Sequence, residues 1–168
     1  MSNVIAVTGH RPKKISPELY DPMSDLSKRY INSFKKFLIE NNCDYAISGM
    51  ALGIDTLFAI AVLQLRKEGY SIKLECAIPC LNHGDKWPPS SQHLYDMILN
   101  KSDKVTLVSN IPYNRNVMQI RNEYMVDHCD LLLAIYDGGR GGTENCIQYA
   151  KTKECNIKIF SPFDFIKE

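Results

Sequence analysis

The chain has 168 residues, which is enough for one domain with a buried core and too few for two domains of ordinary size. Twenty Lys and Arg residues against 19 Asp and Glu residues leave a formal charge of +1, so we expect no general attraction to nucleic acid or anionic lipid. The sequence contains neither a signal-peptide pattern nor a run of about 18 apolar residues, which predicts a soluble cytoplasmic protein without membrane contact.

In the first half of the chain, short apolar segments alternate with helical patterns. Strands are predicted at NVIAVTG (3–9), YAISG (45–49) and IKLECAIP (72–79). Large apolar residues recur every fourth position in a predicted helix over 24–41. The helix predicted over 53–69 is apolar on nearly all sides. We therefore expect it to be buried on two sides, between the sheet and either another helix or a dimer partner.

The second half repeats the alternation. Helices are predicted over 90–102, 114–128 and 143–153, and strands over 104–109, 131–136 and 156–160. Most strands are continuously apolar, which is typical of a parallel sheet covered on both faces. The sequence therefore predicts a single α/β domain over 1–168, with a doubly wound, mostly parallel, Rossmann-like sheet.

Three glycine-bearing bends follow predicted strands: TGHRP (8–12), SGMALGID (48–55) and DGGRGGTE (137–144). In doubly wound folds, ligands bind beyond the carboxyl ends of the strands. Glycine lets the backbone approach a ligand closely, and the amides at a helix N-terminus attract anions. The bends are therefore predicted to form a phosphate cradle, although each one alone is also explained as a tight strand-to-helix turn.

Hydroxyl, amide and basic side chains in and near these bends supply the other contacts that a phosphate needs. Four candidate residues keep a structural alternative: Asp55 as an acid that complements its helix N-terminus, and Arg11, Arg115 and Arg140 as solvated charges. The residues predicted to bind the ligand are Thr8, Gly9, His10, Arg11, Ser48, Gly49, Met50, Gly53, Asp55, Arg115, Asn122, Asp137, Gly138, Gly139, Arg140, Gly141, Gly142 and Thr143.

Common nucleotide and metal motifs are missing. The first bend has one glycine instead of GxGxxG, and GxxxxGK[ST] does not occur, which argues against an ordinary NAD dehydrogenase and a Walker-type NTPase. Six cysteines without CxxC spacing are typical of reduced core thiols. We expect no bound metal and no cofactor.

The polar stretch 79–95 carries Trp87 between prolines. A tryptophan there either covers the pocket and stacks on a base or fills the edge of the core. The sequence leaves both roles open.

Several motifs together resemble a known superfamily. SGMALGID is similar to the SG-x-A-x-GID signature of DprA-type proteins, and IRNEYMVDHCDLLLAIYDGGRGGTE resembles the corresponding segment of the LOG phosphoribohydrolases. These groups belong to the SLOG superfamily. The TGHRP start, the IP after the third strand, Trp87 and NRNVMQIRNEYMVDHCD make the chain most similar to the YpsA-like group.

The resemblance implies a Rossmann-like domain that binds a nucleotide or nucleotide-derived ligand, commonly as a homodimer. The superfamily contains sensors of signalling nucleotides, enzymes that cleave the N-glycosidic bond of nucleoside 5'-monophosphates, and DNA-binding proteins. The predicted function is binding or sensing of a small molecule related to NAD, ADP-ribose or a nucleoside monophosphate.

The alternative is a LOG-like phosphoribohydrolase. Aligned without a gap, the chain resembles the LOG enzymes with Arg121 and Glu144 as the catalytic pair, the Arg holding phosphate and the carboxylate stabilising an oxocarbenium-like state. Alignment on Thr143 instead places the catalytic position at Cys146. A DprA-like role on single-stranded DNA is the third hypothesis. The near-neutral charge argues against it, because strand binding normally needs a cationic track.

Overall fold

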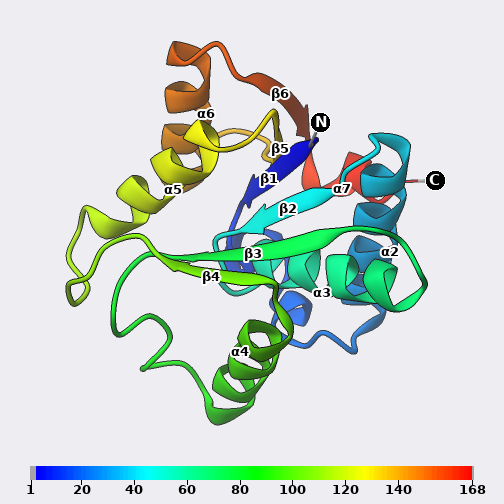
Figure 1. The fold of residues 1–168 in the computed structure, drawn as a ribbon, viewed down its shortest axis with the longest axis horizontal. Coiled ribbons are helices and arrows are strands. Elements are labelled where there is room, and N and C mark those ends of the chain that lie inside the picture. Colours follow the sequence, from blue (N-terminus) through cyan, green and yellow to red (C-terminus); the bar gives the residue numbers. More distant parts are fainter. Residues whose placement is uncertain (1–2, 168) are drawn as a thin grey trace.

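The computed structural model describes residues 3–167, which form one doubly wound α/β layer structure (Figure 1). Six parallel strands make a single sheet in the order β4-β3-β2-β1-β5-β6. Their bounds are Val4–Gly9 (β1), Tyr45–Ser48 (β2), Lys73–Ile78 (β3), Lys104–Leu107 (β4), Leu131–Ile135 (β5) and Asn156–Phe160 (β6). The predicted Rossmann-like fold is confirmed.

Helices cover both faces of the sheet. One face carries α2 (Asp25–Glu40), α3 (Ile54–Lys67) and α4 (Pro89–Lys101), and the other carries α5 (Val117–Asp127) and α6 (Gly142–Thr152) (Figure 1). Three short turns, which the sequence patterns did not predict, complete the fold: α1 (Pro12–Ile15), η1 (Pro17–Tyr20) and α7 (Pro162–Phe165). Each begins with proline, whose fixed φ suits the first position of a helix.

The two-sided burial predicted for α3 is explained by a helix of the same chain. α3 packs on β1, β2 and β3 and also against α2. Phe34 of α2 meets Phe58 of α3 edge to face, with ring centroids 5.4 Å apart, and both rings are fully buried. Aromatic pairs favour this geometry. The dimer partner that the sequence allowed above this helix is therefore not needed to bury it.

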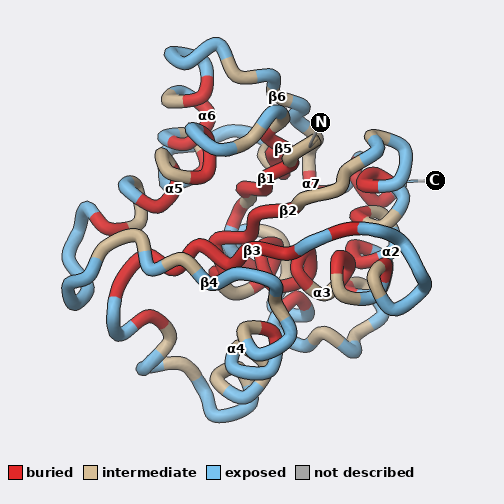
Figure 2. Tube along the Cα trace, viewed as in Figure 1, coloured by how far each residue is buried: buried red, intermediate tan, exposed pale blue. Residues whose placement is uncertain are grey.

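The strand predicted over 104–109 and the helix predicted over 114–128 were both too long. β4 ends at Leu107, and α5 begins at Val117, so residues 108–116 form a connection. Lys104, Val105 and Leu107 are exposed, and so the two-sided cover expected for the strands does not extend to this edge strand (Figure 2). All six cysteines are free thiols, and Cys76, Cys80 and Cys146 are buried. No helix among residues 3–167 is long and apolar enough to cross a membrane.

The sheet order places the switch point between β1 and β5. Residues 4–107 build the sheet outward from β1 to β4, and α5 then returns the chain to the other side of β1. The loops after β1 and β5 consequently diverge to opposite faces of the sheet. Ligands of doubly wound proteins bind in the crevice that such diverging loops leave.

Candidate functional site

A cavity of about 110 Å³ opens at the carboxyl ends of β1 and β5. We call it the anion cavity. The bend after β1, the first turn of α3, one side of α5 and the glycine loop before α6 form its wall. Its lining consists of Thr8, Gly9, His10, Arg11, Lys14, Asp55, Met118, Arg121, Asn122, Met125, Tyr136, Gly139, Arg140, Gly141, Gly142, Thr143 and Glu144.

The glycine loop beside this cavity has unpaired backbone amides. Gly138 and Gly139 have φ angles of 117° and 98°, which residues other than glycine rarely adopt. Helix α6 has no side-chain cap at Gly141. Among residues 3–167, the N–H groups from Gly138 to Glu144 donate to no acceptor of the protein. An uncapped helix N-terminus with free amides carries partial positive charge and is suited to an anion.

Arg121 brings a buried positive charge to the same cavity. Only 2% of its surface is exposed. Its Nε donates to Asn122 Oδ1 at 2.9 Å, and its two Nη atoms donate to the Gly49 carbonyl and, at 3.7 Å, to Met118 Sδ. A guanidinium carries more N–H donors than these three acceptors use. Among the described residues it forms no ion pair.

Burial lowers the pKa of Arg121, and the nearby Asp55 opposes this effect. Burial also raises the pKa of Asp55, against the charges of Arg121 and Arg11. Asp55 interacts with Arg121 without forming an ion pair, so an anionic ligand would add a direct counter-charge to the buried cation.

The second glycine bend acts differently from the cradle that the sequence predicted. Two of its amides are occupied by the protein: Met50 N–H donates to Ser48 Oγ, and Ala51 N–H donates to Asp55 Oδ2, both at 3.2 Å. A Cβ at Gly49 would lie 2.7 Å from Arg121 Nη1. This bend therefore makes room for the buried arginine, and two of its amides are not free for a ligand.

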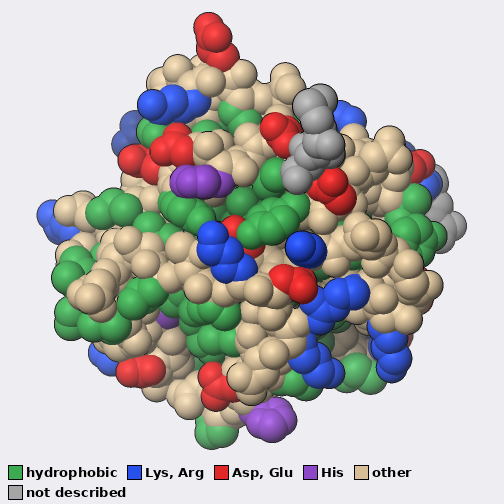
Figure 3. Space-filling model, viewed as in Figure 1, with side chains coloured by type: hydrophobic (Ala, Val, Ile, Leu, Met, Phe, Trp, Pro, Cys, Tyr) green, Lys and Arg blue, Asp and Glu red, His purple; other side chains and the backbone are tan. Residues whose placement is uncertain are grey.

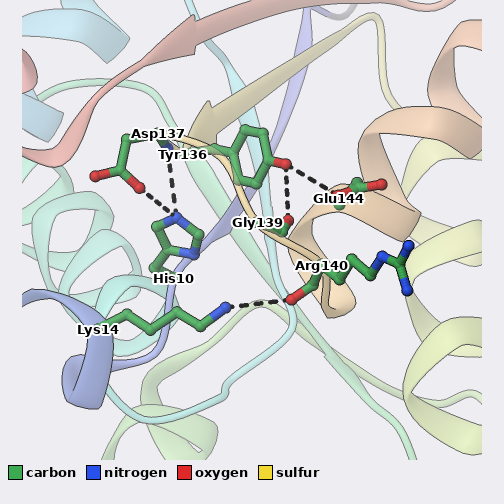
Figure 4. Close-up of polar contacts among 7 residues, drawn as sticks. All are labelled: His10, Lys14, Tyr136, Asp137, Gly139, Arg140 and Glu144. Atoms are coloured by element: carbon green, nitrogen blue, oxygen red, sulfur yellow. Dashed lines mark hydrogen bonds and ion pairs between the residues drawn. The ribbon is translucent and has the colours of Figure 1, made fainter.

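A chain of polar contacts fixes the loop after β5 (Figure 4). His10 Nε2 lies 2.8 Å from Asp137 Oδ1, which ties the first bend to the third. The Tyr136 hydroxyl donates to the Gly139 carbonyl at 2.8 Å and contacts Glu144 Oε2 at 3.2 Å. Glu144 thus reaches the cavity with one carboxylate oxygen already in contact with a hydroxyl.

Lys14 is a cavity residue that the sequence reasoning missed. Its Nζ donates to the Arg140 carbonyl at 3.3 Å and crosses from α1 to the glycine loop (Figure 4). The Arg140 side chain extends away from Lys14 in the same view. Lys14 lies three residues after Arg11, so one helical turn places both on the same side. That spacing in HRPKK was the signal available in the sequence.

The cavity brings together thirteen of the twenty residues named from the sequence, counting Arg121 and Glu144. Seven others lie outside its lining: Ser48, Gly49, Met50, Gly53, Arg115, Asp137 and Gly138. Ser48 and Met50 are fully buried. A Cβ at Gly53 would lie 2.6 Å from the Pro12 ring, so this glycine serves close packing. Arg115 is exposed in the connection before α5.

Fold and topology define the class first: an all-parallel, doubly wound α/β protein of Rossmann type, with a polar crevice at its switch point. The particular family follows from the sequence match. The model of the YspA SLOG family matches residues 5–165, and the chain belongs to this family.

Relatives in bacilli share this sequence pattern. The chain is 30% identical over 140 residues to the uncharacterized SPbeta prophage-derived protein YoqJ of Bacillus subtilis, covering 77% of this chain and 82% of YoqJ. It is 25% identical over 162 residues to a UPF0398 protein of Bacillus thuringiensis, covering 95% and 88% of the two chains.

Three solved structures share the fold. DNA processing protein A from Streptococcus pneumoniae has a TM-score of 0.64 at 21% identity; the match covers 98% of this chain but only 53% of that protein. The Helicobacter pylori protein of the same name, described with a single-stranded DNA binding mode, has a TM-score of 0.61 at 14% identity, covering 94% and 64%. The molybdenum cofactor binding protein of Rippkaea orientalis has a TM-score of 0.55 at 13% identity, covering 95% and 76%.

Family membership supports a general ligand-binding role, and the similar structures establish the fold. They do not support the sequence-based argument against nucleic acid, since two of the similar structures are DNA processing proteins. Net charge was a weak criterion because it averages over the whole surface, whereas binding of single-stranded DNA depends on a local groove of positive charge.

Proposed function

We propose that the protein binds a nucleotide or a nucleotide-derived small molecule, with a phosphate group in the anion cavity. The observation that carries this proposal is the buried Arg121 guanidinium, which has spare N–H donors and lines the same cavity as residues 139–144, whose backbone amides are unpaired. Oriented amides and a fork-shaped guanidinium together match the oxygens of a phosphate.

The volume limits what this cavity holds. Sites for drug-sized ligands usually measure about 300–1,000 Å³, whereas the anion cavity measures about 110 Å³. A phosphate with the adjoining edge of a ribose suits this space, and the rest of a nucleotide would extend outward. The ligand class is therefore a phosphorylated ribose derivative, such as a nucleoside monophosphate or ADP-ribose.

Calorimetric titration with ribose 5-phosphate, AMP and ADP-ribose tests the proposal, with uncharged ribose as the control. We expect saturable binding of at least ribose 5-phosphate, and a rise in melting temperature that follows its concentration. If none of the three phosphorylated compounds binds at millimolar concentration, while the protein remains folded, the proposed phosphate site is wrong.

Hydrolysis of a nucleoside monophosphate is the second candidate, because Glu144 and Arg121 line the same cavity. A carboxylate beside the ribose would stabilise an oxocarbenium-like state or activate water. Chromatographic detection of free base from AMP tests this reaction. Activity that disappears in Glu144→Gln would make the protein an enzyme, and binding without base release would leave it a binder or sensor.

Single-stranded DNA is the competing ligand suggested by the similar structures. A fluorescent oligothymidine in an anisotropy titration separates the two ideas. Saturable oligonucleotide binding that ribose 5-phosphate does not displace would favour DNA. Oligonucleotide binding that falls to zero in moderate salt, beside salt-tolerant ribose 5-phosphate binding, would favour the small molecule.

We also propose a cytoplasmic homodimer. Val105 and Leu107 of β4 and Ile111 of the connection to α5 are exposed hydrophobic residues, and Figure 3 shows hydrophobic surface where this connection lies. A second copy of the chain would cover this surface, because contiguous apolar patches mark interaction sites. Six free cysteines suit a reducing compartment. Light scattering of wild type and Leu107→Lys tests the dimer, which we expect the substitution to weaken.

A further inference from the structure

A second, larger cavity of about 530 Å³ lies next to the anion cavity. Arg11 and Met118 line both, so the two cavities adjoin at these two side chains. We call it the Trp87 cavity. The loops after β1, β2, β3 and β4 supply its lining, which consists of Arg11, Pro12, Lys13, Tyr20, Leu52, Cys80, Asn82, His83, Gly84, Asp85, Lys86, Trp87, Tyr113 and Met118.

The Trp87 ring is held in a fixed orientation. It packs edge to face on His83 and on Tyr95, with ring centroids 4.9 and 5.3 Å apart. His83 Nδ1 in turn lies 3.2 Å from the Tyr95 hydroxyl. A Cβ at Gly84 would come within 2.9 Å of the Trp87 ring, so only glycine permits this close approach. The ring is half-buried, packed on one side and lining the cavity as well.

The connection after β4, which supplies Tyr113 to the Trp87 cavity, is hydrogen-bonded to the loop that carries Trp87. Leu81 N–H donates to the Ile111 carbonyl at 2.9 Å, and Tyr113 N–H donates to Asn82 Oδ1 at 2.8 Å. These bonds join the loop after β3 to the connection after β4. Tyr113 is nevertheless 60% exposed, and its ring lines the cavity without a core to fill.

The chemistry of this wall suits a flat aromatic group. Two tyrosines and one tryptophan offer ring faces, while Leu52 and Met118 supply apolar surface. Asp85 and Asn82 add polar atoms that can meet the edge of a heterocycle. Cavities of this size that combine apolar walls with a few polar groups are typical small-molecule sites.

We propose that the Trp87 cavity receives the base of the nucleotide whose phosphate occupies the anion cavity. The inference rests on the proposed function, and it adds a second subsite and a role for Trp87. The sequence left open whether Trp87 fills the edge of the core or covers the pocket and stacks on a base. In this proposal it does both: one part of the ring packs on the protein, and the exposed part contacts the base. The aromatic side chains then select nucleotides over other phosphorylated sugars.

The sequence offers a direct probe, because Trp87 is the only tryptophan among 168 residues. Tryptophan emission of the wild-type protein therefore reports this cavity alone. We expect AMP or ADP-ribose to quench or shift the emission in a saturable way, with ribose 5-phosphate leaving it unchanged. The nucleotide is also expected to bind more tightly than ribose 5-phosphate.

Two variants give the size of the effect. Base-on-aromatic stacking contributes about 1–3 kcal/mol, so Trp87→Leu is expected to weaken AMP or ADP-ribose binding roughly 5- to 150-fold in calorimetry, leaving the ribose 5-phosphate affinity within about twofold. Tyr113→Ala removes an exposed ring and is expected to weaken the nucleotide in the same direction without loss of folding. Tyr70→Ala, a similarly exposed tyrosine outside both cavities, is the matched control.

The outcomes separate this inference from the proposed function. Equal binding of ribose 5-phosphate and the nucleotides, with unchanged Trp87 emission, would overturn the base subsite and leave the phosphate site standing. Failure of every phosphorylated compound to bind would overturn both. Weaker nucleotide binding in Tyr113→Ala but not Tyr70→Ala would support the base subsite even if Trp87→Leu does not fold.

Discussion

Replacing the buried arginine is the sharpest test of the anion cavity. Arg121→Met keeps an unbranched side chain of similar length and removes the guanidinium. In the ligand-free protein, Arg121 still has N–H donors beyond the three contacts to Gly49, Asn122 and Met118. Two such donors to a phosphate, each a charge-assisted bond of about 1.5–3 kcal/mol, give roughly 3–6 kcal/mol in total.

That energy corresponds to a loss of roughly 100- to 20,000-fold in affinity for ribose 5-phosphate. Isothermal titration calorimetry measures it, with circular dichroism melting to establish that the variant is folded. Arg29→Met, which makes the same change of charge on α2 outside the cavity, is the control and is expected to bind within about threefold of wild type.

A second variant moves Arg121 without changing its chemistry. The Cβ added by Gly49→Ala would lie 2.7 Å from Arg121 Nη1, so the guanidinium has to shift. We expect a smaller loss than in Arg121→Met, because the displaced guanidinium keeps its charge near the site. Wild-type affinity in both variants would refute the assignment of Arg121 to the phosphate.

Two further predictions concern stability. Glu75 is 97% buried and accepts bonds from the hydroxyls of Tyr45, Thr106 and Tyr124 at 2.5, 2.8 and 2.6 Å; these bonds outweigh the effect of burial and lower its pKa. Glu75→Leu is expected to cost about 2–3 kcal/mol in urea unfolding at pH 7, and a smaller cost in Glu75→Gln would fit the loss of an acceptor. Burial, followed by the charges of Arg121 and Arg11, lowers the pKa of His83 to about 3. Because the unfolded chain then binds a proton that the folded chain does not, stability falls as pH drops below about 6.5, by roughly 2 kcal/mol between pH 7.5 and 5. His83→Gln is expected to flatten the melting temperature over this interval, and an unchanged pH profile would contradict the buried neutral imidazole.

The pattern of apolar segments was sufficient to predict the sheet and its helices. The central segments Ile5–Val7 of β1 and Leu132–Ile135 of β5 are apolar at every position, because helices cover both faces of a parallel sheet there. The predicted end of β4 was wrong because this strand lies at the edge of the sheet. Its exposed residues carry little information about where the strand stops. The short proline-started turns were missed because one helical turn has no periodicity to detect.

Local sequence determined which segments of this protein are strands, which are helices, and that three glycine bends follow strands, since backbone conformation and burial pattern depend on neighbouring residues. Only the tertiary structure decided what each bend does. Gly49 resembled a phosphate contact in sequence, but 72 positions separate it from Arg121, the side chain it makes room for. Lys14 and the paired cavities around Arg11 and Met118 likewise depend on which strands become neighbours. Strand order brings such distant residues together, and the short-range signals of a single sequence do not contain it.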